Sequence, residues 1–357
     1  MELIYYIFFI FTSYILSKYT QNNTSLKSFV LLSLYMAFFL AIRQVPGDNL
    51  QYEEAYRGRY VREYELGWAY LISACKNLGF SLVAYKCFAI YFLHLFLFLN
   101  ALKKEWYPYL SLFIVFYCLL GIESSSNIMR HWMAACVILV GYRLYTSNLN
   151  IAKRIVLYFS CVFVASLFHK SAFMSVIVPF LLYSKIPSYK IQCVLYIAAF
   201  VGGAIFMNLW EYASQYLAGD DFVYNFYFNH YDVNKVQTTS GLGQIYYVIE
   251  SCIIAYMYHK KIITNNIARS TNQYYTLYFW GMVLFFLTCT FQDMARLSLY
   301  FSIVQIIIIA LFVHQGLNKN GIVKTMAYII IVMRMALFIR TTLADEIYGI
   351  TPIKFLI

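Results

Sequence analysis

The sequence predicts an all-α polytopic integral membrane protein with about 12 transmembrane helices in a single domain, residues 1–357. Hydrophobic residues make up 62% of the chain and charged residues 12%, against roughly 25% charged in an ordinary soluble domain. The apolar residues gather in runs of about 13 to 21, which match a ~30 Å hydrocarbon core once interfacial aromatic residues are added. The 36 Tyr and 31 Phe suit lipid-facing and interfacial positions.

The apolar runs give the expected helices in chain order. They are Leu3 to Leu16, Phe29 to Ile42, Leu82 to Leu102, Tyr107 to Ile122, Ile128 to Tyr145, Ile155 to Phe168, Ser171 to Tyr183, Ile191 to Trp210, Leu242 to Tyr258, Tyr274 to Phe291, Leu297 to Val313 and Ile322 to Ile339. The amphipathic stretch 66–79 is expected to form an interfacial or re-entrant helix. The first run lacks a basic segment and a small-residue cleavage site, so we expect a retained helix rather than a signal peptide.

Lysine and arginine residues assign the two sides of the membrane, because short cytoplasmic loops are enriched in them. Six loops each carry at least two, and we place these loops in the cytoplasm and both termini outside. The loops contain Lys18 with Lys27, Lys103 with Lys104, Lys153 with Arg154, Lys185 with Lys190, Lys260 with Lys261 and Arg269, and Lys319 with Lys324. Arg57, Arg59 and Arg62 do not follow this rule, because the assigned topology places them on the external side. Topology and anionic ligands explain the net charge of +11 better than nucleic-acid binding does.

This orientation brings most of the polar segments to the external side. They are an external motif loop at 43–65, the turn at 123–131, the tip at His169 and Lys170, a long external loop at 211–241 and the turn at 292–296. Ionisable residues at the ends of membrane helices are costly and mark functional sites more often than chance. The external side is therefore the candidate active face.

Four motifs lie on this side. In the first, Pro46 and Gly47 break the helix after Arg43, and we expect Asp48 and Tyr52 to sit in an ordered loop.

The other three motifs are also built on basic residues. Arg130 opens one apolar run, and its side chain can point back into an external cavity. His169 and Lys170 interrupt a long apolar stretch with no turn residue nearby, and Arg296 opens another run.

Together the motifs resemble those of the Wzy-type bacterial polysaccharide polymerases, in particular the EpsG-like branch. Members carry an Arg, a Gly-x-Asp turn and a Tyr, then an Arg at a middle helix start, a Phe-His-x-Ser-Ala segment and an Ala-Arg-x-x-x-Tyr-Phe helix start. The matching positions are Arg43, Gly47, Asp48, Tyr52, Arg130, Phe168, His169, Ser171, Ala172, Arg296, Tyr300 and Phe301.

Two positions depart from the family pattern. Gly47 and Asp48 are adjacent where many relatives have a residue between them, and His131 follows Arg130 where Gln is usual. We assign the acidic position to Asp48 rather than Asn49, because Asp48 keeps the four-residue spacing to Tyr52.

The resemblance implies a glycosyltransferase with a GT-C-like helical bundle and external loops in the bacterial cytoplasmic (inner) membrane. Such an enzyme polymerises undecaprenyl-pyrophosphate-linked oligosaccharide repeat units, as donor and acceptor, into O-antigen, capsule or exopolysaccharide on the periplasmic side. It uses no cofactor, metal or nucleotide sugar, binds no nucleic acid, and can work with a chain-length-regulating co-polymerase.

This interpretation assigns roles to the motif residues. Asp48 or His169 accepts the proton of the acceptor hydroxyl, and a basic cluster binds the pyrophosphate, which arginines hold bidentately. The basic cluster is Arg43, Arg130, Arg296 and Lys170. The residues expected to contact the glycan are Tyr52, Tyr300, Tyr224, Tyr227 and His230, of which Tyr224, Tyr227 and His230 lie in the long external loop.

Three other functions stay open. An O-antigen ligase would use similar arginines and the same carrier lipid, and the acceptor alone separates the two. A flippase or other transporter would place ionisable residues along a midplane pathway and show internal repeats, and neither pattern is visible. A membrane O-acyltransferase would need acidic or serine partners for His169. The acidic pair Asp220 and Asp221 lacks the Asp-x-Asp spacing of a metal or sugar-binding site, so a solvated loop is expected there. The chain has no Walker-type glycine loop, which argues against nucleotide-driven chemistry.

Overall fold

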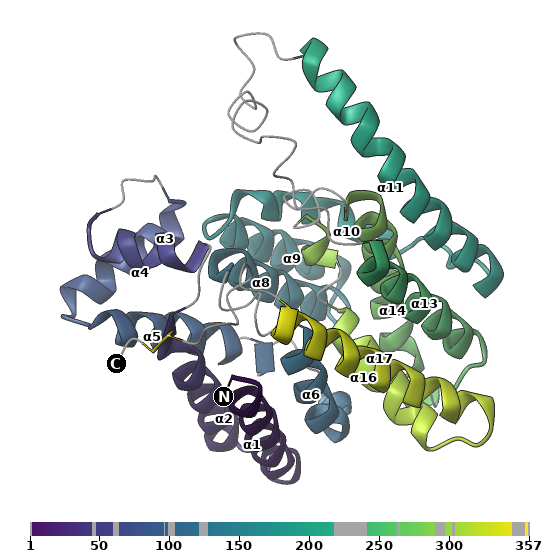
Figure 1. Ribbon diagram of the computed structural model, residues 1–357, viewed down its shortest axis with the longest axis horizontal. Helices are drawn as coiled ribbons and strands as arrows, with labels where there is room; N and C mark the ends of the chain where they lie inside the picture. Colours follow the sequence, from purple (N-terminus) through teal and green to yellow (C-terminus); the bar gives the residue numbers. More distant parts are fainter. Residues whose placement is uncertain are drawn as a thin grey trace. The chain divides into compact units, whose positions relative to one another are not determined.

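The computed structural model describes residues 2–44, 48–59, 64–95, 97–98, 104–120, 128–217, 241–262, 265–289, 297–301, 304–344 and 354–355 (Figure 1). Over these ranges the chain is almost entirely helical, which confirms the predicted all-α class. The described residues form two compact units, Met1–Val176 with Ile306–Ile357, and Ile177–Gln305.

The first unit carries most of the predicted motifs. Its elements, with α16 starting at the boundary, are α1 Glu2–Asn22, α2 Leu26–Ala41, β1 Arg43–Gln44, α3 Asp48–Tyr56, α4 Leu66–Asn77, α5 Leu82–Leu95, η2 Lys104–Tyr109, α6 Leu110–Leu120, α8 Met129–Tyr145, α9 Ile151–Ser166, η3 Lys170–Ile177, α16 Gln305–Leu317, α17 Ile322–Ala344 and β2 Lys354–Phe355. The two short strands pair antiparallel, with Arg43 opposite Phe355.

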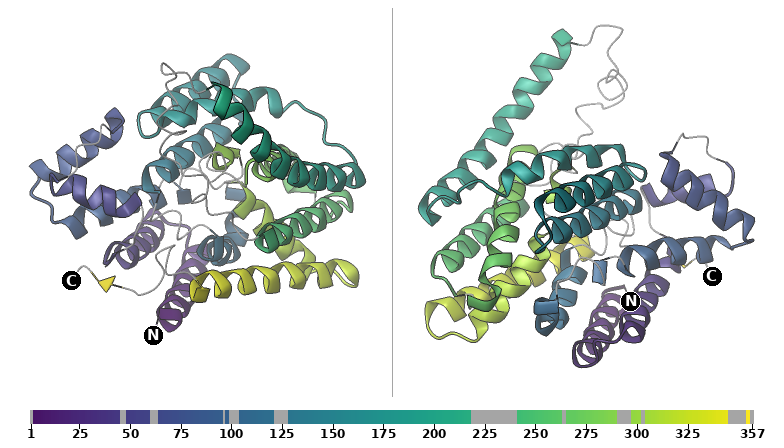
Figure 2. Two further views of the ribbon diagram at one scale, coloured as in Figure 1. Left: turned by 45° about the horizontal axis from the view of Figure 1, so that its top comes forward. Right: turned by 180° about the vertical axis from the view of Figure 1, so that it is seen from behind.

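Polar residues mark the starts of two helices in this unit. The Ser25 hydroxyl accepts a hydrogen bond from the Ser28 N–H at 3.3 Å and caps α2 after the short turn from α1. The two helices form a hairpin, visible near the N-terminus in Figures 1 and 2. The Asn150 side chain likewise accepts from the Lys153 N–H at 2.8 Å and caps α9, which packs along α8.

Apolar side chains cover the outside of several helices of the first unit. On α9, Tyr158 and Val162 are buried against the unit, while Phe163 on the other side is 60% exposed. On α1, Ile4 is 71% and Phe11 60% exposed. A soluble monomer rarely leaves such extended apolar surface in water, so these faces suit contact with lipid tails and indicate a membrane protein.

The described helices differ in whether they are long enough to cross a membrane. Among the described residues, one helical stretch, Ile322–Arg340 in α17, is long and apolar enough to cross a bilayer, with a mean hydropathy of 2.0. Several others are apolar but shorter, such as Leu26–Ala41 and Gln305–Leu317. The number of about 12 crossings therefore stays a prediction.

The structure differs from the expectations in several places. Helix α11 (Tyr189–Leu217) continues into the expected loop at 211–241, and the expected helix from Tyr107 starts within the 3-10 helix η2. Helix α3 begins at Asp48, where we expected an ordered loop. The helix breakers Pro46 and Gly47 precede it in the sequence, and an aspartate is favoured at a helix N-terminus. The expected single helix from 171 to 183 is instead the 3-10 helix η3 followed by α10 Val178–Leu181, with Pro179 in its first turn.

The second unit is built around one long helix. Its other helices besides α10 are α11 Tyr189–Leu217, α13 Gly241–His259 and α14 Asn265–Thr288, and α11 packs against both α13 and α14. A Cβ on Gly203 would lie 2.4 Å from the Phe286 carbonyl oxygen, so the close approach of α11 and α14 requires glycine there.

Candidate active site

Gly67 brings the start of α4 against the end of α9. Its N–H donates a hydrogen bond to the Leu167 carbonyl oxygen at 2.7 Å. A Cβ at this position would lie 2.8 Å from the same oxygen, so a larger residue would push the two segments apart. As a result Glu65, at the N-cap of α4, lies beside His169 and Lys170.

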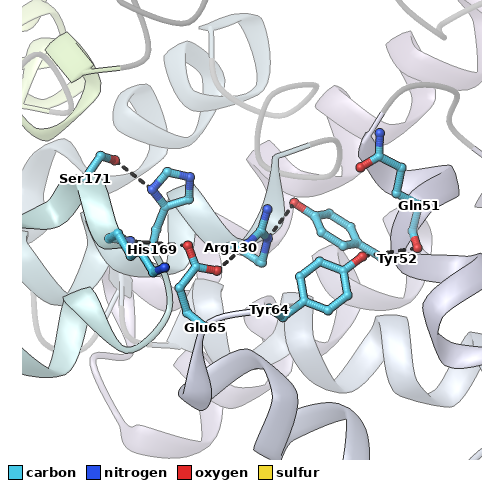
Figure 3. Close-up of polar contacts among 8 residues, drawn as sticks. Gln51, Tyr52, Tyr64, Glu65, Arg130, His169 and Ser171 are labelled. Atoms are coloured by element: carbon cyan, nitrogen blue, oxygen red, sulfur yellow. Dashed lines mark hydrogen bonds and ion pairs between the residues drawn. The ribbon is translucent and has the colours of Figure 1, made fainter. Parts of the chain in front are cut away.

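The guanidinium of Arg130 is fixed from several sides at the beginning of α8. Its Nη1 atom forms an ion pair with Glu65 Oε2, and its Nε donates a hydrogen bond to the Tyr52 hydroxyl at 3.4 Å (Figure 3). The ring centres of Tyr64 and Tyr52 lie 4.8 and 5.6 Å from the guanidinium carbon, within the range of a cation–π contact. Arg130 is 8% exposed, so its orientation is well defined.

The second oxygen of Glu65 reaches the tip between α9 and η3. Oε1 accepts a hydrogen bond from the Lys170 backbone N–H at 3.3 Å. Burial raises the pKa of Glu65, but the Arg130 guanidinium, the backbone N–H groups of Glu65 and Lys170 and the nearby His169 outweigh burial and lower it. Glu65 is therefore ionised at neutral pH.

His169 is held by two neighbours at this tip. Its Nδ1 lies 2.6 Å from the Ser171 hydroxyl, and its ring stacks on His131 with a centroid distance of 4.4 Å. Figure 3 shows the Glu65 carboxylate between His169 and Arg130. The site thus combines a carboxylate, a guanidinium and an imidazole from three segments of the first unit.

A second buried ion pair supports the site beside Tyr52. Lys86 Nζ on α5 lies 2.9 Å from Glu53 Oε1 on α3, and both side chains are 1% exposed. The neighbouring Tyr52 packs on Trp68 of α4 with ring centres 5.3 Å apart. These contacts link α3, α4 and α5 and hold Tyr52 against Arg130.

The structure brings together some of the predicted site residues. Arg130, Tyr52, His169 and Lys170 lie in one cluster, although Tyr52 is 2% exposed, so contact between Tyr52 and a glycan stays a prediction. Lys170 joins through its backbone, and its side chain is exposed.

Other predicted residues lie elsewhere. The structure describes the backbone of Arg43 in β1 and of Asp48 at the start of α3. Tyr300 belongs to the second unit, where it is fully buried. Four predicted residues lie outside the described ranges: Arg296, Tyr224, Tyr227 and His230.

Sequence reasoning missed Glu65 and Tyr64 as site residues. Glu65 belongs by sequence to the polar residues just before the amphipathic stretch, and nothing distinguishes Tyr64 from the many other tyrosines. The positive charge of Arg130 could have indicated such a partner, because an arginine at the start of a membrane helix requires a counter-ion or an anionic ligand. Several acidic residues, such as Glu53 and Glu63, meet that condition in the sequence, so the choice of partner needs the tertiary structure.

This arrangement suits charge stabilisation and proton transfer. A buried guanidinium stabilises anionic oxygens, and an imidazole beside a carboxylate can accept a proton because the imidazolium it becomes is stabilised. In the part of the chain that the structure describes, no group of three His, Cys, Asp or Glu residues is placed to hold a metal ion.

Comparison with known proteins places the chain in a family. The family model described as EpsG family matches residues 26–355, which covers nearly the whole chain and every residue of the cluster. No curated protein and no solved structure matches the chain significantly.

Proposed function

The chain belongs to the EpsG family, whose members are Wzy-type polymerases, and from this we propose that it polymerises undecaprenyl-pyrophosphate-linked oligosaccharide repeat units. It is a membrane glycosyltransferase of the bacterial inner membrane with its active face on the periplasmic side. The product is O-antigen, capsule or exopolysaccharide. Both donor and acceptor are lipid-linked oligosaccharides, and a chain-length-regulating co-polymerase is a candidate partner.

The proposed reaction is a displacement at a sugar carbon. A hydroxyl oxygen of the acceptor repeat unit attacks the anomeric carbon of the growing glycan, and the bond from that carbon to the pyrophosphate oxygen breaks. The electron pair leaves with undecaprenyl pyrophosphate, and the hydroxyl proton passes to a base. The chain therefore grows at its reducing end.

The observation that carries this proposal is the cluster of Arg130, Glu65 and His169. The reaction needs a cation where the pyrophosphate charge develops and a base near the acceptor hydroxyl. The cluster supplies a guanidinium fixed by the Glu65 carboxylate. The same carboxylate binds the Lys170 N–H at the tip that carries the His169 imidazole. We assign the base to His169 or Asp48.

The pyrophosphate site is proposed to combine Arg130 with Arg43, Arg296 and Lys170. Arginine carries five N–H donors, and the contacts with Glu65 and Tyr52 engage Nη1 and Nε of Arg130, so we assign its Nη2 edge to the anion. The Lys170 backbone binds Glu65 while its side chain points to the exposed surface, where its ammonium can reach a phosphate.

A deletion strain tests the proposal in cells. Loss of the gene should leave single repeat units on lipid A in an O-antigen producer, seen as a gel with one short band instead of a ladder. Wild type and the distant control Lys319→Arg should both restore the ladder. Loss of all repeats from lipid A, with lipid-linked polymer accumulating, would instead indicate a ligase and reject the polymerase assignment.

A further inference from the structure

The Glu65 carboxylate makes contacts that its own helix does not use. Glu65 occupies the N-cap of α4, yet its side chain makes no capping hydrogen bond. Its two oxygens instead bind Arg130 on α8 and the Lys170 N–H at the start of η3. The carboxylate therefore joins the start of α8 to the tip that carries His169.

Stability alone is a weak reason for such a pair. The side chains of Arg130 and Glu65 are 10% and 13% exposed, and desolvating two charges offsets most of their attraction. Arg130 also lies in the first turn of α8, where the helix dipole disfavours a cation. A pair placed here against these costs points to a requirement on geometry.

We propose that Glu65 is a positioning residue of the polymerase site, acting as the resident counter-ion that holds the Arg130 guanidinium against the His169 tip. The inference rests on the proposed function, because its turnover is measured as polymerisation of lipid-linked repeat units. It also has a consequence independent of turnover. A negative charge beside Arg130 opposes a bound pyrophosphate, so Glu65 weakens anion binding while it aligns the guanidinium for the reaction.

The test measures binding and turnover on the same purified full-length protein in detergent. Calorimetry with inorganic pyrophosphate gives the affinity, and lipid-linked repeat units give kcat and KM. Glu65→Gln removes one negative charge at roughly 8 Å from the bound anion, so this variant should bind pyrophosphate about tenfold more tightly. Its kcat should fall at least roughly tenfold, because the guanidinium is no longer aligned.

Two variants serve as matched comparisons. Glu54 pairs with Arg57 and Arg59 at 3.8 and 4.0 Å on the exposed surface of the same unit, so Glu54→Gln should change neither quantity by more than about twofold. Glu65→Asp keeps the charge on a shorter side chain. It should bind pyrophosphate like wild type yet lose kcat, and full kcat in this variant would overturn the inference even if Glu65→Gln fails to fold.

A charge swap tests whether the ion pair also holds the two segments together. Glu65→Arg combined with Arg130→Glu restores the pair with its ends exchanged, so we expect the thermal midpoint to recover relative to the single variants while turnover stays lost. Recovery of turnover would contradict the inference. If wild type fails to polymerise, the proposed function falls, and pyrophosphate affinity still decides: tighter binding by Glu65→Gln supports the inference, and unchanged or weaker binding rejects it.

Discussion

The backbone N–H of Gly67 donates a hydrogen bond to the carbonyl oxygen of Leu167 at 2.7 Å. The two residues are far apart in the sequence, and their contact places the N-cap of α4 beside the tip at the end of α9. Without that contact Glu65 would not reach both Arg130 and Lys170. The proposed catalytic geometry therefore depends on a backbone approach that only glycine allows.

Gly67→Ala should separate the two segments. A Cβ 2.8 Å from a backbone oxygen forces a shift, and we expect a loss of about 1–3 kcal/mol in stability together with reduced turnover. Gly202→Ala is the matched control, because its Cβ would meet the Leu287 side chain at an ordinary 3.5 Å. Thermal unfolding of both variants in detergent checks this, and an unchanged midpoint for Gly67→Ala would show that the approach is dispensable.

Arg130→Lys should impair turnover while leaving the protein folded. Lysine keeps the charge beside Glu65 but loses the planar fork and the Nε contact with Tyr52. We expect polymerisation to fall by about 10- to 100-fold. Rates measured beside Lys319→Arg, which should keep wild-type activity, give the comparison; wild-type turnover in Arg130→Lys would remove Arg130 from the pyrophosphate site.

The two candidate bases can be separated by single substitutions. His169→Gln and Asp48→Asn each remove a proton acceptor with little change in size, and loss of the true base should reduce kcat by about 10²–10⁴-fold. The other variant should keep most of its activity. Polymer yield is compared at equal protein levels, and normal polymerisation by both variants would mean that neither residue is the base.

The fold could be predicted from the sequence where apolar runs are long and uninterrupted. The runs beginning at Leu82, Ile128 and Ile322 lie within one residue of the starts of α5, α8 and α17. One exception is the segment at Asp48, because Pro46 and Gly47 predict the end of a helix without determining the structure of the segment that follows. Helix α3 is short and polar, so the pattern of hydrophobic residues does not predict it.

The site could be predicted only in part, for a physical reason. Arginine and histidine at the ends of apolar runs are costly, so Arg130 and His169 could be recognised individually. The partner of Arg130 lies 65 residues away, and neither charge nor spacing distinguishes Glu65 from other nearby carboxylates. The choice is made by the contact of Gly67 at the start of α4 with Leu167 at the end of α9, and not by any charged residue.

The orientation of the chain is tested by chemical labelling. Single cysteines replacing Lys103 and Lys235, in a background without the eight native cysteines, should differ in reactivity with an impermeant thiol reagent on spheroplasts. We expect labelling at 235 and protection at 103, because positive charges favour the cytoplasmic side. Labelling at 103 but not at 235 would reverse the assigned faces.

Polymerisation by the purified protein tests the central claim most directly. Full-length protein reconstituted with lipid-linked repeat units, and with no nucleotide sugar added, should convert them into a ladder of longer glycans and release undecaprenyl pyrophosphate. The Arg130→Lys variant should give a ladder at least roughly tenfold weaker. Repeat units that stay at unit length with folded wild-type protein would contradict the account.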